Sequence, residues 1–435
     1  MILRRAWMTM ALAVAAMLGQ GASAQTIDRI VHAGTLIDGT GAAPRRDVSI
    51  LISGEKIVSV EPGKVTRPGA AITDLSGLTV LPGFINTHMH LDLKEGSNNP
   101  VADAMQSSEL DHLMQDAINA REMLKRGFTS ARTLGSLGED AALKRGIDRG
   151  AVPGPRLWVA LEQLGATGSV ADRSTGFDEN LSNPHWARRI LDSPDQAAFQ
   201  VRDRKKRGAD LIKIMVSGAV TSLAPEGVAM QRLSDEEIRA VVKAARELNM
   251  KVAAHAYGPE AIKAAVAGGV SSIEHGSYAD EAALRAMKEK GVYLVPTLTI
   301  FAIQQDLART KPELFNPVIR EKTLALGDTP WRMVTMAHKI GVKIAFGSDA
   351  VLPARLAEEF GHYVRAGLTP MEAIQTATTN AADLIGASDR IGSIQPGRFA
   401  DLVAVAGDPL KDVSILTKLA FVMKGGAVVR DDIAN

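Results

Sequence analysis

The chain has 435 residues, with 50 Lys and Arg against 49 Asp and Glu, so its formal net charge is +1. It has no basic block and only 10 Phe, 4 Tyr and 4 Trp, which argues against nucleic acid as a partner. Because cysteine is absent, disulfides, thiolate ligands and a cysteine nucleophile are excluded. Any bound metal would therefore need His, Asp, Glu or Lys as ligands.

The N-terminal segment has the pattern of a secretory signal peptide. Two arginines precede an apolar run over residues 6–18, and Ala22-Ser23-Ala24 supplies the small residues that signal peptidase accepts. The alternative is a membrane anchor, but the run is shorter than the roughly 20 apolar residues that span a bilayer. We expect residues 1–24 to be removed and the protein to be periplasmic or secreted, with no stable membrane insertion.

Stretches of partly alternating apolar residues predict β-strands at both ends of the chain. They include "DRIVHAGTLIDGTG" and "DVSILISGEKIVSV" near the N-terminus and "FADLVAVAGDP" and "AFVMKGGAVV" near the C-terminus. We expect residues 25–83 and 389–435 to form together one small β-sandwich domain.

Between these segments, over residues 84–388, short apolar strands alternate with Ala-rich and charged helical patterns. Eight such strands can be counted, from "PGFINTHMH" to "KIAFGSDA", and one following helix has Ser234 and Glu237 in the positions of a capping box. Eight βα alternations predict an α/β fold, a (β/α)8 TIM barrel. A doubly wound sheet is the alternative, but the glycine fingerprint of a dinucleotide-binding version is missing after the first strand.

Four histidines fall at or near the C-terminal ends of predicted strands. They are His88 and His90 on the first strand, His255 on the fifth and His275 on the sixth. In a barrel these ends converge on one mouth, and side chains two residues apart on a strand point the same way. Neutral imidazoles in that arrangement are good ligands for Zn²⁺ or a similar ion. The His-x-His pair alone is a weak motif, and the two further histidines strengthen it.

The other five histidines are weaker candidates, because solvation or ordinary packing explains their positions. His362 could approach the mouth, although a solvated helix position fits it better. The remaining four are His32, His112, His185 and His338.

Two charged residues complete the candidate site. Lys213 lies inside the apolar strand "LIKIMVS", where burial would favour its neutral form, and a neutral lysine can combine with carbon dioxide to form a carbamate that bridges two metals. Taken alone, it would more readily be a snorkelling lysine or part of an ion pair. Asp349 ends the eighth strand in "IAFGSDA", where a lone Asp is usually a helix cap. Because Lys213 and Asp349 would face the same mouth as the four histidines, together they favour a metal site.

The motifs in this order, with the tail "IGSIQPGRFADLVAVAGDP", resemble the amidohydrolase superfamily over essentially all of residues 25–435. Within it, the chain is most similar to the dipeptidase-like and carboxypeptidase-like branch, and particularly to bacterial amidohydrolases that hydrolyse ochratoxin A. The resemblance implies two divalent metal ions, with Zn²⁺ expected, bridged by a hydroxide and by Lys213 as N6-carboxylysine. The other implied ligands are His88, His90 and Asp349 for one metal and His255 and His275 for the second.

The resemblance also implies catalytic roles. The bridging hydroxide would attack the amide carbonyl, with Asp349 as general base and then general acid. Tyr257, two residues after His255, is a candidate for holding the carbonyl oxygen or a substrate carboxylate, and a structural tyrosine is nearly as good an interpretation. One departure concerns Ser169 and Val170, which stand where relatives commonly carry Gly and a substrate-contacting His. The pocket wall should therefore be more apolar here.

The leading hypothesis is a hydrolase of the amide bond to a C-terminal hydrophobic or aromatic amino acid, in N-acyl amino acids, dipeptides or ochratoxin A, from which it would release L-phenylalanine. The first alternative is hydrolysis of cyclic amides, lactones or phosphotriesters by the same site. An exported, non-catalytic metal- or solute-binding protein is a further alternative, against which Asp349 argues. Relatives also imply a homo-oligomer such as an octamer.

Overall fold

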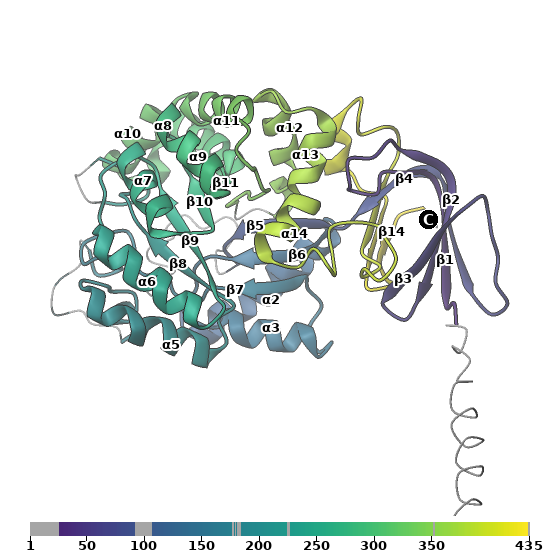
Figure 1. Ribbon diagram of the computed structural model, residues 1–435, viewed down its shortest axis with the longest axis horizontal. Coiled ribbons are helices and arrows are strands. Elements are labelled where there is room, and N and C mark those ends of the chain that lie inside the picture. The colour runs from purple at the N-terminus through teal and green to yellow at the C-terminus, as the bar shows by residue number, and fades with distance from the viewer. Residues whose placement is uncertain are drawn as a thin grey trace, which may run out of the picture.

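The computed structural model describes residues 26–433, except 92–106, 176, 177, 179, 181–183, 224–226, 351 and 352. Figure 1 shows a larger body of helices and strands beside a smaller, strand-rich part that contains the first and the last strands of the chain. The predicted signal peptide lies outside the described residues. Within the described part of the chain, no helix is long and apolar enough to cross a membrane.

A seven-stranded sheet takes its strands from both ends of the chain, in the order β14-β13-β12-β4-β1-β2-β3. Its two halves meet where β4 pairs antiparallel with β12, with Val80 opposite Ala404. The strands are β1 (Arg29–Leu36), β2 (Arg45–Ser53), β3 (Lys56–Pro62), β4 (Ala71–Pro82), β12 (Leu402–Val405), β13 (Phe421–Lys424) and β14 (Ala427–Asp431).

The hydrogen bonds join all seven strands into one continuous sheet. The reason is the length of β4, whose 12 residues pair with β1 along most of the strand and with β12 at its end. Apolar side chains from both ends of the chain then share one buried cluster, which includes Val31, Ile50, Leu402 and Phe421.

Seven of the eight predicted barrel strands are formed, and they pair in parallel in two sheets, β5-β6-β7 and β11-β10-β9-β8. The α/β class is therefore confirmed. The strands are β5 (Phe84–Met89), β6 (Phe128–Thr133), β7 (Arg156–Val159), β8 (Leu211–Met215), β9 (Lys251–Ala256), β10 (Ser272–His275) and β11 (Tyr293–Val295).

The eighth predicted strand, residues 343–350, is not assigned as a strand, and only Ile344 makes a bridge, to Leu294 of β11. The partners of Phe346 explain this. Its N–H donates to Thr376 O at 2.9 Å, outside any ladder, while its own carbonyl accepts from the Thr87 N–H at 2.8 Å. The segment still lies between β11 and β5, because it is hydrogen-bonded to both.

The two parallel sheets are also connected at their other edges. Leu164, which follows β7, donates its N–H to Lys213 O at 2.9 Å and accepts from the Met215 N–H at 2.8 Å. Leu164 therefore links the end of β7 to β8. The segment over residues 343–350 links β11 to β5 in the same way.

Helices lie around the parallel strands (Figure 1). The capping box predicted at Ser234 and Glu237 is present at the start of α6. The helices are α2 (Glu109–Lys125), α3 (Asp140–Asp148), α4 (Pro184–Ala187), α5 (Ala197–Arg207), α6 (Asp235–Glu247), α7 (Pro259–Gly268), α8 (Glu281–Lys290), α9 (Leu298–Thr310), α10 (Pro317–Leu326), α11 (Thr329–Ile340), α12 (Glu358–Arg365), α13 (Pro370–Thr376) and α14 (Thr379–Ile385), with 3-10 turns at Pro194–Gln196, Pro312–Leu314, Pro353–Arg355 and Val413–Thr417.

Gly83 marks the passage from the terminal sheet into the parallel strands, between β4 and β5. A Cβ atom at this position would lie 2.3 Å from Thr129 Oγ1, closer than non-bonded atoms can approach. The close packing of β5 against β6 at this point therefore requires glycine.

Candidate metal centre

The six predicted ligand residues lie at or near the carboxyl ends of the parallel strands. Because neighbouring strands run in the same direction, these ends share one edge of each sheet. His88 is the next-to-last residue of β5 and His90 follows that strand, Lys213 is central in β8, His255 is next to last in β9, His275 ends β10, and Asp349 lies in the segment after Ile344.

Three of these residues form a group that can hold a metal ion. His88, His90 and Asp349 each offer one ligand atom, and the three atoms lie within 4.8 Å of one another. The Nε2 atoms of His88 and His90 are 3.6 Å and 3.4 Å from Asp349 Oδ1. Two imidazole nitrogens and a carboxylate oxygen around one point match the ligands that Zn²⁺ prefers.

His255 and His275 lie directly beside this group. Their ring centroids are 4.7 Å apart, and the His275 ring is 5.0 Å from the His88 ring. The structure thus brings the four predicted histidines together in one cluster.

Each imidazole uses one ring nitrogen in a hydrogen bond outside the cluster, which leaves its second nitrogen for a metal ion. Partners of this kind fix the tautomer and the ring orientation of a ligand. They are Glu274 Oε2 for His88 Nδ1 (2.8 Å), Gly135 O for His90 Nδ1 (3.1 Å), Thr297 Oγ1 for His275 Nδ1 (2.8 Å) and Gly218 O for His255 Nε2 (3.0 Å).

The sequence analysis missed the carboxylate of Glu274 and its partner Arg132. Glu274 is fully buried; its Oε2 faces His88, while its Oε1 accepts from Arg132 Nη2 at 2.8 Å and from the Ser272 hydroxyl. Burial lowers the pKa of Arg132, whereas its contact with Glu274 acts in the opposite direction. A signal was available, because both are charged residues inside short predicted strands, as Lys213 is.

Lys213 is 2% exposed, and its Nζ atom has no hydrogen-bond partner. A buried amine without an acceptor is costly in free energy. Burial lowers the pKa of Lys213 to about 8, although Glu274 and Asp349 oppose that shift. The neutral amine is therefore accessible near neutral pH.

Burial also shifts the pKa values of the other candidate ligands. It lowers the pKa of His255 to about 3 and holds the pKa values of His88 and His275 well below the ordinary histidine value, with Lys213 acting in the same direction. These imidazoles are thus neutral at neutral pH, the form that binds metals. Although a fifth of its side chain is exposed, Asp349 has its pKa raised by burial, against the opposing effect of His90 and Lys213.

The backbone is strained at this edge. His275, Thr297 and Asp349 have φ angles of 70°, 53° and 49°, in the left-handed region that non-glycine residues rarely adopt. The Asp349 N–H donates to His88 O at 3.0 Å, which helps to hold its conformation. Such strain persists where the surrounding structure enforces it, and it is concentrated at functional sites.

Tyr257 packs against the centre. It is 3% exposed, its ring is stacked on His275 with centroids 5.3 Å apart and an interplanar angle of 12°, and it also contacts His255 and Phe301 edge-on. Burial raises the pKa of Tyr257 well above its ordinary value, so the hydroxyl keeps its proton.

The remaining histidines have other surroundings. His362, for which we predicted a solvated helix position, is half-buried against Trp331, and burial lowers its pKa to about 4. His338 pairs with Glu372 at 3.1 Å, and His32 contacts Val65 O at 2.9 Å. His112 is buried on α2, and the side chain of His185 lies outside the described part of the structure.

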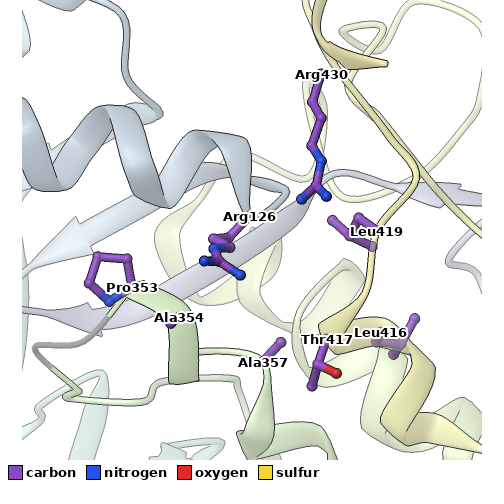
Figure 2. Close-up of a pocket in the computed structure, with 8 residues that line it drawn as sticks. All are labelled: Arg126, Pro353, Ala354, Ala357, Leu416, Thr417, Leu419 and Arg430. Atoms are coloured by element: carbon purple, nitrogen blue, oxygen red, sulfur yellow. The ribbon is translucent and has the colours of Figure 1, made fainter. Parts of the chain in front are cut away.

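Two hollows elsewhere contain none of the ligand residues. Figure 2 shows the smaller one, toward which the guanidinium groups of Arg126 and Arg430 extend. Its volume of about 10 Å³ suits a single water molecule. The other is a groove of about 740 Å³ at the start of α10, beside Phe315 and Leu324.

Comparison with known proteins decides the family. Residues 79–429 match the pattern of the amidohydrolase family. The chain belongs to the amidohydrolase family. The match includes all the parallel strands and the terminal strands β12 and β13. The predicted membership is confirmed, and the protein is a hydrolase that acts on amide bonds. Amidohydrolases generally use divalent metal ions, in agreement with the group formed by His88, His90 and Asp349.

Several relatives cover nearly the whole chain. This amidohydrolase is 30% identical to ochratoxinase of Aspergillus niger over 422 residues, 92% of this chain and 86% of the relative. It is similar to the structure of a Xaa-Pro dipeptidase with methionine in the active site (33% identity, TM-score 0.86, 92% and 99% coverage). A prolidase complexed with N-methylphosphonate-L-proline gives 32% identity, a TM-score of 0.85 and coverage of 93% and 100%.

We predict that Glu274→Gln weakens metal binding and lowers stability. The substitution releases His88 and leaves the Arg132 charge buried without a counter-charge, which should lower the free energy of unfolding by about 3 kcal/mol. Metal affinity, measured by competition with a chelator, should fall about 10- to 100-fold. The control is Glu162→Gln, another buried carboxylate paired with an arginine, Arg207 at 2.6 Å. It should lose stability alone, and equal metal affinity in both variants would contradict the role of Glu274.

Proposed function

We propose that this amidohydrolase hydrolyses the amide bond between an acyl or aminoacyl group and a C-terminal hydrophobic or aromatic amino acid. N-acyl amino acids, dipeptides and ochratoxin A, which would release L-phenylalanine, are the expected substrates. One observation carries the proposal: four imidazoles, Asp349 and the unpartnered amine of Lys213 gather at the carboxyl ends of parallel strands. The ochratoxinase, dipeptidase and prolidase relatives support this substrate class.

The residues present fit a pair of divalent metal ions. The lone buried Nζ of Lys213 and the four imidazoles with one nitrogen each held from outside are what such a pair requires. When bound, the ions supply Lewis acidity that activates water and polarises a carbonyl group. Zn²⁺ is expected, although Co²⁺ and Mn²⁺ suit the same donors. The ligands would be His88, His90 and Asp349 for one ion and His255 and His275 for the other.

Lys213 would join the centre as N6-carboxylysine. Its neutral amine attacks carbon dioxide, an N–C bond forms and one proton is released, so the product carries a negative charge and two oxygens. The side chain changes in this way from a donor without an acceptor into a group that can ligate both metals. The lowered pKa of Lys213 favours the reaction, because only the neutral amine is a nucleophile.

Asp349 would move the proton. Both of its close contacts with imidazoles use Oδ1, which leaves Oδ2 to accept a hydrogen bond from the attacking water. Burial makes this carboxyl group a stronger base than an ordinary aspartate. It can therefore take the proton of the water and pass it to the nitrogen of the departing amino acid.

Tyr257 would bind the substrate. Its hydroxyl keeps its proton, so it can donate a hydrogen bond either to the scissile carbonyl oxygen or to the free carboxylate of the substrate. The resemblance places Ser169, which is buried, and Val170, which is half-buried, in the pocket wall, where the valine would favour an apolar side chain on the substrate.

We further propose that the two parallel sheets form a (β/α)8 barrel. Hydrogen bonds through Leu164 link the end of β7 to β8, and those through residues 343–350 link β11 to β5. The closed barrel would explain why all the ligand residues converge. The sandwich form of the terminal domain, export after removal of residues 1–24 and a homo-oligomer such as an octamer stay predictions from the sequence.

Lys213→Ala should lose most activity and part of its metal. Without the bridging carbamate we expect fewer than two ions per chain and a fall in kcat/KM of about 100-fold or more. Metal analysis and hydrolysis of N-acetyl-phenylalanine on one preparation test this. Lys424→Ala is the matched control, since burial lowers the pKa of Lys424 to about 8 as well but its Nζ donates to Gly154 O at 2.6 Å in another part of the fold. Full activity in Lys213→Ala would refute the bridging role.

Tyr257→Phe separates the two roles of the tyrosine. Loss of a donor to the carbonyl oxygen should lower kcat about 100-fold, whereas loss of a donor to the substrate carboxylate should raise KM with kcat retained. Steady-state kinetics on N-acetyl-phenylalanine give the answer, with Tyr278→Phe as the control, because Tyr278 is half-buried and its N–H donates to Tyr257 O at 3.0 Å. If neither constant changes by more than about twofold, Tyr257 is structural.

A substrate panel tests the proposed class. N-acyl derivatives of phenylalanine and leucine should have kcat/KM values at least about tenfold above those of aspartate and lysine, because charged side chains lose hydration in an apolar pocket. Ochratoxin A, lactones and phosphotriesters belong in the same panel. Faster hydrolysis of lactones or phosphotriesters than of every amide would replace the proposal with its first alternative.

A further inference from the structure

The start of helix α9 lacks the hydrogen bond that its own N-cap residue would normally supply. The first amides of a helix have no partners within the helix, and an N-cap threonine usually accepts from one of them. Thr297 is the N-cap residue of α9, yet its side chain makes no capping hydrogen bond and its φ angle is 53°. The amides of this buried helix end therefore need another acceptor.

The hydroxyl of Thr297 is used elsewhere. Its Oγ1 lies 2.8 Å from Nδ1 of His275, the residue that ends β10, and both side chains are buried. For Nε2 of His275 to have a free lone pair, the proton must be on Nδ1, and the Nδ1–H must donate its hydrogen bond to Thr297 Oγ1. The hydroxyl of Thr297 is therefore hydrogen-bonded to His275 and does not cap α9.

Glu359 of helix α12 supplies the missing cap. Its Oε1 accepts from the Leu298 N–H at 2.8 Å, and its Oε2 accepts from both the N–H and the hydroxyl of Thr299 at 2.6 Å. A carboxylate is favourable at the positive end of a helix dipole. The two oxygens satisfy the first two amides of α9 from a position about sixty residues away in sequence.

Burying the Glu359 carboxylate costs free energy, which argues that it does more than cap α9. Glu359 is fully buried, and within the described residues no lysine or arginine forms an ion pair with it. Burial raises its pKa to about 7, although the hydrogen bonds from Thr299 and Leu298 oppose the shift. A threonine at the N-cap could provide one of these hydrogen bonds without burying a charge.

We propose that Glu359 is a positioning residue for His275: by capping α9 from α12, it frees the Thr297 hydroxyl to hold His275 Nδ1 and keeps Nε2 directed at the metal centre. The inference rests on the proposed function in so far as His275 is a metal ligand. It assigns to Glu359 an effect on one of the two metal sites, although Glu359 lies on α12 and acts on that site through the start of α9.

The test compares metal binding by Glu359→Gln and the wild-type protein. Glutamine keeps the size of the side chain but turns one acceptor into a donor that faces a backbone N–H. We expect one of the two metal ions to bind about 10- to 100-fold more weakly, with the affinity of the other unchanged. Chelator competition gives the two affinities, and the absorption spectrum of the Co²⁺-loaded protein should change for one site only.

Two variants of Thr297 test whether Glu359 affects His275 through this threonine. Thr297→Val should reproduce the defect, and Thr297→Ser, which keeps the hydroxyl, should restore wild-type affinity. Because Glu359 acts through Thr297, the double variant Glu359→Gln/Thr297→Val should lose no more affinity than either single variant. Additive losses would overturn the route through the threonine.

Asp401→Asn is the control for loss of a buried carboxylate, since Asp401 accepts from Arg156 and from the Gly425 N–H beside the terminal sheet. It should lower the melting temperature and leave both metal affinities unchanged. Wild-type affinity in Glu359→Gln, or an equal loss at both sites, would overturn the positioning role and leave the proposed function intact. Fewer than two ions in the wild-type protein would instead contradict the proposed function.

Discussion

The buried carboxylate of Glu274 is the constraint on which the metal centre depends. It lies between His88 of β5 and Arg132 of β6, and it belongs to β10 itself. Neither it nor Arg132 can be removed without leaving an uncompensated charge in the interior, which costs several kcal/mol. The contacts of Glu274 therefore connect β5, β6 and β10, and its carboxylate holds one ring nitrogen of His88.

Burial also explains the protonation states at the site. Desolvation disfavours every charged form, so the imidazoles stay neutral, Lys213 loses its proton more readily and Asp349 becomes more basic. In water these groups would differ widely in charge at neutral pH. One physical cause thus favours neutral imidazoles, a neutral amine at Lys213 and a more basic carboxylate at Asp349, at a free-energy cost that bound cations would offset.

The orientation of the ligands comes from outside the cluster, and the partners differ in chemical kind. Backbone carbonyl groups hold His90 and His255, a carboxylate holds His88 and a hydroxyl holds His275. His275 at the end of β10 and Asp349 in the segment after Ile344 both have left-handed φ angles, and this local strain lies at the two ligand positions. Glu359 extends the same organisation to a helix that has no ligand of its own.

The sequence by itself determined the α/β class, the seven parallel strands and the residues that meet near their ends, because short apolar runs between helical patterns are a local property of the sequence. The grouping of His88, His90 and Asp349 came from the resemblance to the amidohydrolase superfamily, and the structure places their ligand atoms within 4.8 Å of one another. Only the tertiary structure decided the parts that depend on distant partners. The eighth predicted strand is interrupted because the Phe346 N–H donates to Thr376 O. Glu274 pairs with Arg132, about 140 positions away in sequence, and Glu359 caps a helix about 60 positions away. No local pattern says which buried carboxylate will meet which imidazole or helix end, since that depends on how the strands and helices pack.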